Sequence, residues 1–285
     1  MSRRIPSLFM LLFCLLIPQT TWATWWLEAY DGKPEDFRLI RDGKAFAVIN
    51  GTVLKPGDTI NILSADGKLV LKDDFDNKAK TITKRDGTFT IPPQHPRPGP
   101  LGNVFALIDE KICIFFNYKT TKSELSSRSK GLPVLILGAS SAKNYLLAGT
   151  DTLTVHWIDG EPPYRVQLLD DEDNVIAKKT GIQDTHATFT DANLPTGEYT
   201  LKVSGKVSSY FIHLTAVEAK NAPDLYHTIM ASDMPDLFKK RYAATVLGSK
   251  PEWKLQALLL AEQTGWHAFR DRILDGKTPE PIDEK

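Results

Sequence analysis

The chain has 285 residues, of which 42% are hydrophobic, and its 35 Lys and Arg balance 35 Asp and Glu. The two signs are interspersed, and no basic stripe is present that could neutralise a row of phosphates, so we expect no nucleic acid partner. The length exceeds that of one typical core and predicts two or three small domains.

The first 23 residues are typical of a secretory signal peptide. Arg3 and Arg4 precede an apolar run over residues 8–17, and Ala23 ends the segment with a small residue. Ten apolar residues are too few to cross a bilayer, which takes a helix of about 20. We therefore expect cleavage and no stable membrane span afterwards. The mature chain would carry 35 − 2 = 33 cationic and 35 acidic residues.

Residues 24–93 predict a small antiparallel β domain. Runs such as DTINI and GTFTI carry apolar residues at every second position, the period of a half-buried strand. Asp66-Gly67 and Asp86-Gly87 separate such runs. This dipeptide favours a two-residue hairpin turn with positive φ, so we expect a hairpin at each place.

Residues 94–131 predict a proline-rich linker that contains a short amphipathic helix. The linker begins in PPQHPRPGP, where prolines hold the backbone extended. Phe105 and Phe116 belong to an apolar stripe at three- and four-residue steps. This stripe can pack within the chain or bind a partner. Cys113, the only cysteine after removal of the leader, can be free or paired with another molecule's thiol.

Residues 132–220 predict a β-sandwich, because short alternating runs recur with Gly and Pro turns between them. The alternation turns Trp157 toward the core and His156 outward. Four consecutive acids, Asp170 to Asp173, separate two apolar runs. They do not match the ligand spacing of a calcium loop, so we expect a solvated hairpin tip there and no metal site.

Residues 221–285 predict a helical tail, with helices near 234–247, 250–264 and 266–275. Asp233 with Asp236, and Ser249 with Glu252, have the spacing of capping boxes at two helix starts. Three glycines follow apolar-periodic segments, where a helix can end in a left-handed residue: Gly248, Gly265 and Gly276.

Two parts of the chain resemble known domains. The segment from GTDTLTVHWIDGEPPYRVQLL to LPTGEYTLKV resembles an immunoglobulin-like or fibronectin-type sandwich. In that resemblance Trp157 matches the core tryptophan and Tyr199 the tyrosine corner. The segment VLKPGDTINILSADGKLVL resembles the FecR-like β domain of bacterial envelope proteins.

The order of these parts is similar to a family of uncharacterised bacterial periplasmic proteins. That similarity implies a periplasmic, Gram-negative envelope location and a role other than catalysis. The expected fold class is mainly β, with a small N-terminal antiparallel β domain, an Ig-like sandwich and a C-terminal helical segment.

No motif in the sequence indicates a reaction, and the six histidines lack metal-ligand spacing, so we expect no catalytic residue, cofactor or metal. The leading hypothesis is a protein-interaction or structural module that binds another envelope protein. A sandwich that binds glycan or peptidoglycan through exposed aromatics is the alternative, and a hydrolase is the third. The oligomeric state stays open. The candidate interaction residues are Trp25, Trp26, Phe105, Phe116 and Tyr210.

Overall fold

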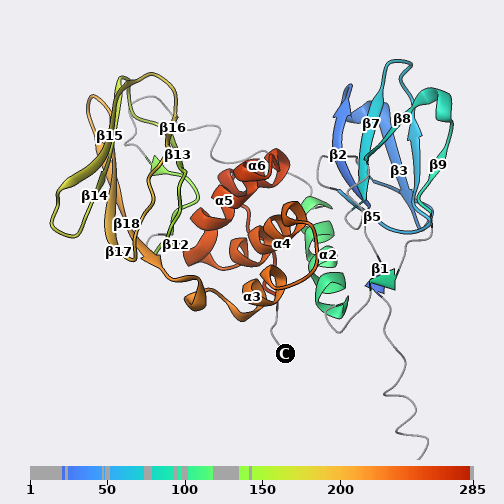
Figure 1. Cartoon of the computed structure of the whole chain (residues 1–285). Helices are drawn as coiled ribbons and strands as arrows, with labels where there is room; N and C mark the ends of the chain where they lie inside the picture. Colours follow the sequence, from blue (N-terminus) through green and yellow to red (C-terminus); the bar gives the residue numbers. More distant parts are fainter. Residues whose placement is uncertain are drawn as a thin grey trace, which may run out of the picture.

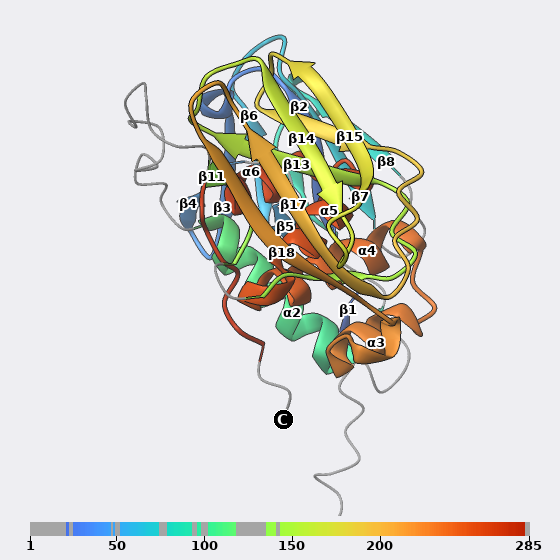
Figure 2. The ribbon, with the colours of Figure 1, turned by 90° about the vertical axis from the view of Figure 1, so that its left-hand side faces the viewer.

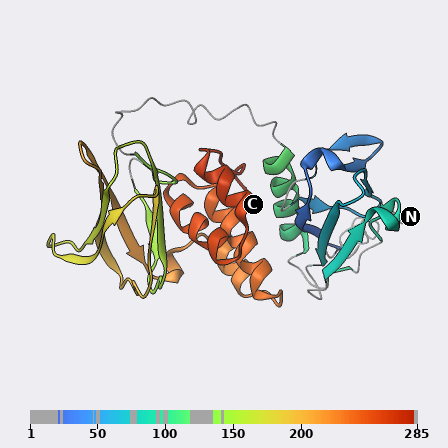
Figure 3. The ribbon, with the colours of Figure 1, turned by 90° about the horizontal axis from the view of Figure 1, so that it is seen from above.

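A computed structural model describes residues 21–22, 25–46, 48, 52–73, 79–92, 96–97, 102–117, 135–140 and 143–282. It places two β units on opposite sides of a layer of helices (Figure 1). The view from above shows the same order of parts (Figure 3). The fold is mainly β with a helical C-terminal segment, as the sequence predicts. Residues 1–20 of the expected signal peptide lie outside the described residues, and Thr21–Trp22 form β1, which pairs with β10 (Pro96–Arg97).

The N-terminal β unit consists of two four-stranded sheets around an apolar core. The first sheet contains, in order, β5 (Val53–Leu54), β2 (Trp25–Asp31), β7 (Lys68–Asp73) and β8 (Ala79–Thr83). The second contains β4 (Lys44–Phe46), β3 (Phe37–Arg41), β6 (Thr59–Ile62) and β9 (Phe89–Thr90). Side chains of both sheets, including Leu27, Leu39, Ile60 and Leu71, meet in this core.

The prediction of hairpins at the two Asp-Gly dipeptides was wrong. Asp66-Gly67 lies between β6 and β7, and Asp86-Gly87 between β8 and β9, and in each case the two strands belong to different sheets. Of the two glycines only Gly87 has a positive φ, of 68°. At position 67 only glycine fits, because a Cβ there would lie 2.8 Å from the side chain of Ile62.

The C-terminal β unit is an Ig-like sandwich. Its smaller sheet contains, in order, β11 (Leu135–Ile136), β13 (Leu153–Ile158) and β16 (His186–Phe189). Its larger sheet contains β12 (Tyr145–Leu147), β18 (Ser209–Val217), β17 (Gly197–Ser204), β14 (Tyr164–Leu169) and β15 (Val175–Ile182). Strands β12 and β18 run parallel, and the other pairs in these two sheets are antiparallel.

The core of the sandwich contains the aromatic residues that the sequence singles out. Trp157 is buried and meets Tyr164 edge to face, with ring centroids 5.3 Å apart. The hydroxyl of Tyr199 donates to the carbonyl of Pro195 at 2.8 Å, as in a tyrosine corner. The inward position of Trp157 and the role of Tyr199 are therefore confirmed.

The four acids form the tip of the β14–β15 hairpin, as predicted. The Asp170 carboxylate accepts the backbone N–H groups of Glu172 at 3.0 Å and Asn174 at 2.8 Å, and Asp173 has a φ of 64°. Desolvation acts to raise the pKa of Asp170, but the side-chain hydrogen bond from Asn174, together with these backbone hydrogen bonds, lowers it below the usual value. The described residues contain no group of His, Cys, Asp and Glu suited to a metal, here or elsewhere.

The helical layer combines one helix from the middle of the chain with those of the tail: α2 (Gly102–Asn117), α3 (Asp224–Met230), α4 (Asp236–Gly248), α5 (Lys254–Gln263) and α6 (His267–Leu274). A short 3-10 turn over Pro251–Trp253 precedes α5. The helices expected at the linker and in the tail are present, whereas the seven-residue α3 was not predicted. Cys113 lies in α2, and its side chain is outside the described residues.

The expected helix ends are partly wrong. The N-caps are Pro235 and Lys250, and neither uses a side-chain cap, so the two capping boxes do not form. Gly265 and Gly276 have positive φ, as expected at helix ends. Gly248 instead ends α4, and a Cβ added there would lie only 3.2 Å from the ring of a buried phenylalanine in α6.

The N-terminal β unit is joined to the helices through one face of β2. Leu27 points into the core of the unit, while Trp26 points the other way and meets Tyr242 and Trp266 edge to face, with centroids 5.8 and 5.6 Å away. Next to it, Glu28 accepts two hydrogen bonds from the buried guanidinium of Arg241, at 3.0 and 3.3 Å. This junction is apolar at its centre and closed by one ion pair.

Candidate functional site

The two outer faces of the C-terminal sandwich have different surroundings. The outer face of β13 and β16 lies toward α5 and α6 (Figure 1). The outer face of the five-stranded sheet lies on the opposite side, and no other part of the described chain covers its centre (Figure 2). We call these the covered face and the open face.

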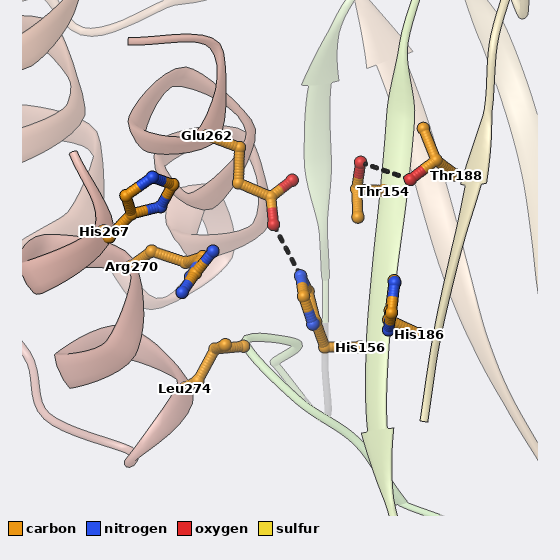
Figure 4. Close-up of a pocket in the computed structure, with 8 residues that line it drawn as sticks. All are labelled: Thr154, His156, His186, Thr188, Glu262, His267, Arg270 and Leu274. Atoms are coloured by element: carbon orange, nitrogen blue, oxygen red, sulfur yellow. Dashed lines mark hydrogen bonds and ion pairs between the residues drawn. The ribbon is translucent and has the colours of Figure 1, made fainter. Parts of the chain in front are cut away.

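A pocket of about 460 Å³ lies between the covered face and the helices (Figure 4). Its walls come from two strands and two helices that are remote from one another in sequence. The lining residues are Thr154, His156, His186, Thr188, Glu262, His267, Arg270 and Leu274.

Strand alternation explains the sandwich side of the pocket. Because Val155 and Trp157 face the core, Thr154 and His156 must face outward. Strand β16 pairs with β13 so that Thr188 lies opposite Thr154 and His186 opposite His156. The two threonine hydroxyls are 3.1 Å apart, and the two imidazole rings stack with centroids 5.8 Å apart.

An ion pair connects this face to α5. Nε2 of His156 lies 2.5 Å from a carboxylate oxygen of Glu262, and both side chains are less than one fifth exposed, at 17% and 18%. Burial alone would raise the pKa of Glu262, but the hydrogen bond and charge of His156, with smaller effects from Thr154 and Arg270, lower it. The carboxylate therefore stays ionised beside the imidazole.

Helix α6 supplies the remaining polar groups of the pocket. His267 begins the helix, and Arg270 lies one turn further on the same side. Nε and Nη2 of Arg270 donate to one carboxylate oxygen of Asp271, at 2.8 and 2.7 Å. Nη1 of Arg270 and the His267 ring donate to no described residue, so both are available toward the pocket.

The pocket gathers polar groups without pairing a nucleophile with a base. Its two hydroxyls bond to each other, and the imidazole of His156 bonds to Glu262. Acyl transfer by a hydroxyl requires the hydroxyl to bond to its base, and glycoside hydrolysis uses two carboxyl groups. Glu262 is the only carboxyl group among the lining residues. The arrangement suits binding better than hydrolysis.

The open face carries an exposed aromatic residue beside cationic side chains. Phe211 is 57% exposed because β18 turns Ile212 and Leu214 into the core and Phe211 outward. Across the sheet, Phe211 lies opposite Lys202 of β17, and Gln167 of β14 separates Lys202 from Lys178 of β15. Neighbouring strands lie about 4.8 Å apart, so these four side chains form one continuous row.

A third cation lies in the next row of the open face. Arg165 precedes Gln167 by two residues on β14 and therefore points to the same side of the sheet. Arg165, Lys178 and Lys202 make no ion pair with the described residues. Neither row contains an acid among the described residues, and Glu198, four residues before Lys202 on β17, accepts a hydrogen bond from Thr215 at 2.9 Å. The face is thus basic at its centre, with the acidic hairpin tip at one end.

The predicted interaction residues are buried or partly buried in the structure, whereas exposed aromatics were expected. Trp26 is fully buried in the junction with the helices, and Phe105 and Phe116 are buried against Tyr242 and Trp266. The stripe of α2 therefore packs within the chain. Trp25 and Tyr210 are partly buried and pack against the two cores.

These five residues do not come together in one exposed site. The sequence contained a signal for the exposed residue on β18, since inward Ile212 and Leu214 require Phe211, and not Tyr210, to face outward. No comparable signal indicated the pocket, whose residues are up to about 120 positions apart.

Comparison with known proteins gives distant structural similarity only. No family model and no curated protein matches the chain. Among solved structures, the BSP domain of a biofilm-associated protein is 13% identical, with a TM-score of 0.24, over 71% of this chain and 26% of that one. Immunoglobulin domains 1–5 of Sidekick-1 are 12% identical, with a TM-score of 0.24, over 71% and 35%.

Domains 4 and 5 of the S-layer protein SbsC are also similar, at 12% identity and a TM-score of 0.21, over 63% of this chain and 99% of that one. The chain spans about a quarter of the biofilm-associated chain and about a third of the Sidekick-1 chain. The assignment of the sandwich rests on the strand order and core of the chain itself. Within the described residues, no helix has the length and apolar character needed to cross a membrane.

Proposed function

We propose that this chain is a non-catalytic periplasmic protein of the cell envelope that binds an acidic surface of another envelope protein through the open face. The observation that carries this proposal is Phe211, a large aromatic residue that the sandwich leaves 57% exposed beside unpaired cations. Aromatic and Arg side chains are the residues most enriched at protein interfaces and in their energetic centres.

The chemistry of the face defines the partner. Phe211 needs an apolar pocket on the partner, and the cations Arg165, Lys178 and Lys202 need carboxylates around that pocket. A second exposed apolar side chain, Val207, which is 67% exposed, lies in the β17–β18 turn four residues before Phe211. Such a partner would bind more weakly as salt rises, since exposed charges are screened within about 10 Å at 0.1 M salt.

The envelope location rests on the N-terminal segment. The twin arginines and the ten-residue apolar run support export through a cleavable signal peptide at residues 1–23. The division into a FecR-like unit (24–93), a linker with α2 (94–131), the sandwich (132–220) and the helical tail (221–285) belongs to the same proposal. Cell fractionation with N-terminal sequencing tests it, and a chain that retains Met1 in the cytoplasm would contradict it.

The non-catalytic role rests on the pocket chemistry. The polar groups of the covered face are committed to one another, in the hydroxyl pair and in the pair of His156 with Glu262. We propose no catalytic residue and no cofactor. A glycan partner for the aromatics Trp25, Trp26 and Tyr210 loses support, because Trp26 is buried and the others are partly buried.

The experiment is a capture assay with the tagged full-length chain, purified from the envelope and incubated with envelope extract and with isolated peptidoglycan. Phe211→Ala and Lys202→Glu should each weaken binding of the captured partner at least about tenfold, and rising salt should release the partner. Leu63→Ala and Lys68→Glu are matched controls on the N-terminal unit, where both residues are exposed. Equal capture by all variants, or capture of peptidoglycan alone, would contradict the proposal.

A further inference from the structure

We infer that the pocket on the covered face is a binding site for a small organic anion, held by its carboxylate or phosphate group. The site is separate from the open face, and it does not depend on the function proposed for that face. It lies where the sandwich and the helices meet, and ligand sites in proteins often form at such junctions between units.

Three hydrogen-bond donors of the pocket have no acceptor among the described residues. Nη1 of Arg270 and the rings of His186 and His267 line the pocket, and none of them makes a hydrogen bond to a described residue. The guanidinium is already oriented by Asp271, which takes the other side of the group. An oriented Arg with open N–H groups matches the oxygens of a carboxylate or phosphate.

The carboxylates at the pocket are engaged by other side chains. The one carboxylate in the lining, Glu262, is occupied by its hydrogen bond to His156 at 2.5 Å. Asp271, the other acid near the pocket, is 60% exposed and pairs with Arg270. The remaining groups, His186 and His267, are neutral or cationic. An entering anion therefore meets the open N–H groups of Arg270, His186 and His267, while the carboxylate of Glu262 is held by His156.

The size and shape of the pocket suit a small organic molecule. A volume of about 460 Å³ falls within the range of about 300–1,000 Å³ typical of small-molecule sites, and it exceeds what a bare phosphate fills. Leu274 supplies an apolar wall, and the stacked rings of His156 and His186 supply a flat one. The ligand would thus be an organic acid or a phosphorylated small molecule, with its anionic group at Arg270 and its body against Leu274.

The test follows the imidazole signals of the full chain by NMR, at constant ionic strength, while inorganic phosphate or citrate is added. The signals of His156, His186 and His267 should move together, and those of His213 and His227 should stay fixed. Citrate should bind more tightly than phosphate because it also fills the pocket. Arg270→Gln should weaken binding about tenfold, and His267→Gln should weaken it less, because each removes a donor to the anion.

The matched control is Arg165→Gln, which removes a cation from the open face and should leave citrate binding unchanged. Arg270 and His267 are not buried, so their variants keep the fold. Three results would overturn the inference: no movement of the three signals at about 50 mM citrate, movement of all six histidines alike, or equal binding by the Arg270→Gln chain. The second of these would mean that the anion is adventitious.

Discussion

The covered and open faces of the sandwich differ although the same strand alternation produces both. On β13, outward His156 pairs with Glu262 of α5, so the imidazole has its partner within the chain. On β18, outward Phe211 meets no helix and stays 57% exposed. The comparison shows that alternation decides which residues leave the core, while the helical tail decides which of them remain available to another molecule.

The largest expected effect on the free energy of unfolding comes from weakening the core of the helices that cover the sandwich. Phe269 is fully buried in α6 and stacks on Trp266 with centroids 4.5 Å apart. Phe269→Ala should lower the free energy of unfolding by about 3–5 kcal/mol, through lost apolar contact and the cavity left behind. Denaturant titration by circular dichroism measures this, and a loss below about 1 kcal/mol would mean that the helices are only loosely attached.

The ion pair between Glu262 of α5 and His156 of β13 should contribute less to stability than Phe269 does. Its contribution should be present only above acidic pH. Glu262→Gln should lower the free energy of unfolding by about 1–2 kcal/mol at pH 7. Because folding lowers the pKa of Glu262, its contribution is present above the unfolded value of about 4.3 and is lost as pH falls through the folded value. The difference between the two chains should therefore shrink below about pH 4.

The control for this prediction is Glu161→Gln, at an exposed position of the sandwich. That variant should match the parent chain at all pH values within about 0.5 kcal/mol. A difference for Glu262→Gln that stays constant from pH 7 to pH 3 would show that the ion pair does not hold the covered face against the helix.

A smaller effect on the free energy of unfolding is expected from the tyrosine corner inside the sandwich. Tyr199→Phe removes the hydroxyl that donates to Pro195 at 2.8 Å and should cost about 1 kcal/mol. The matched control is Tyr210→Phe, on the neighbouring strand, for which no cost is expected. Equal effects of the two substitutions, measured by thermal unfolding, would mean that the tyrosine corner does not stabilise this sandwich.

The smallest effect on stability should come from the open face. Phe211→Ala removes the same kind of side chain as Phe269→Ala, but from water, so the free energy of unfolding should change by less than about 0.5 kcal/mol. Binding of the envelope partner should nevertheless fall. A loss of stability above about 1 kcal/mol would show that Phe211 supports the fold rather than an interface.

The sequence predicted the sandwich well because its signals are local. Trp157, Tyr164 and Tyr199 each lie in runs whose alternation fixes their direction, and the acid-rich tip closes a hairpin between adjacent strands. The two Asp-Gly dipeptides misled because a turn does not reveal whether its flanking strands share a sheet. The capping boxes failed because Pro235 and Lys250 occupy the N-cap positions.

The site was harder to predict because it depends on contacts between units. The direction of His156 was foreseen, but its partner Glu262 lies 106 residues further along the chain. Trp26 was expected at the surface because nothing in its strand shows that helices cover one side. Alternation alone predicts that Phe211 points out of the core. Its exposure to solvent could be known only from the structure, in which the tail covers the other face.

The most direct test of the central claim is photo-crosslinking in living cells, with Phe211 replaced by a benzophenone-bearing amino acid. The account predicts one defined adduct with an envelope protein, lost when Lys202→Glu is added. The same replacement at Leu63, which is 48% exposed on the other β unit, should give no such adduct. No adduct at position 211, or the same adducts at both positions, would contradict the claim that the open face binds a partner.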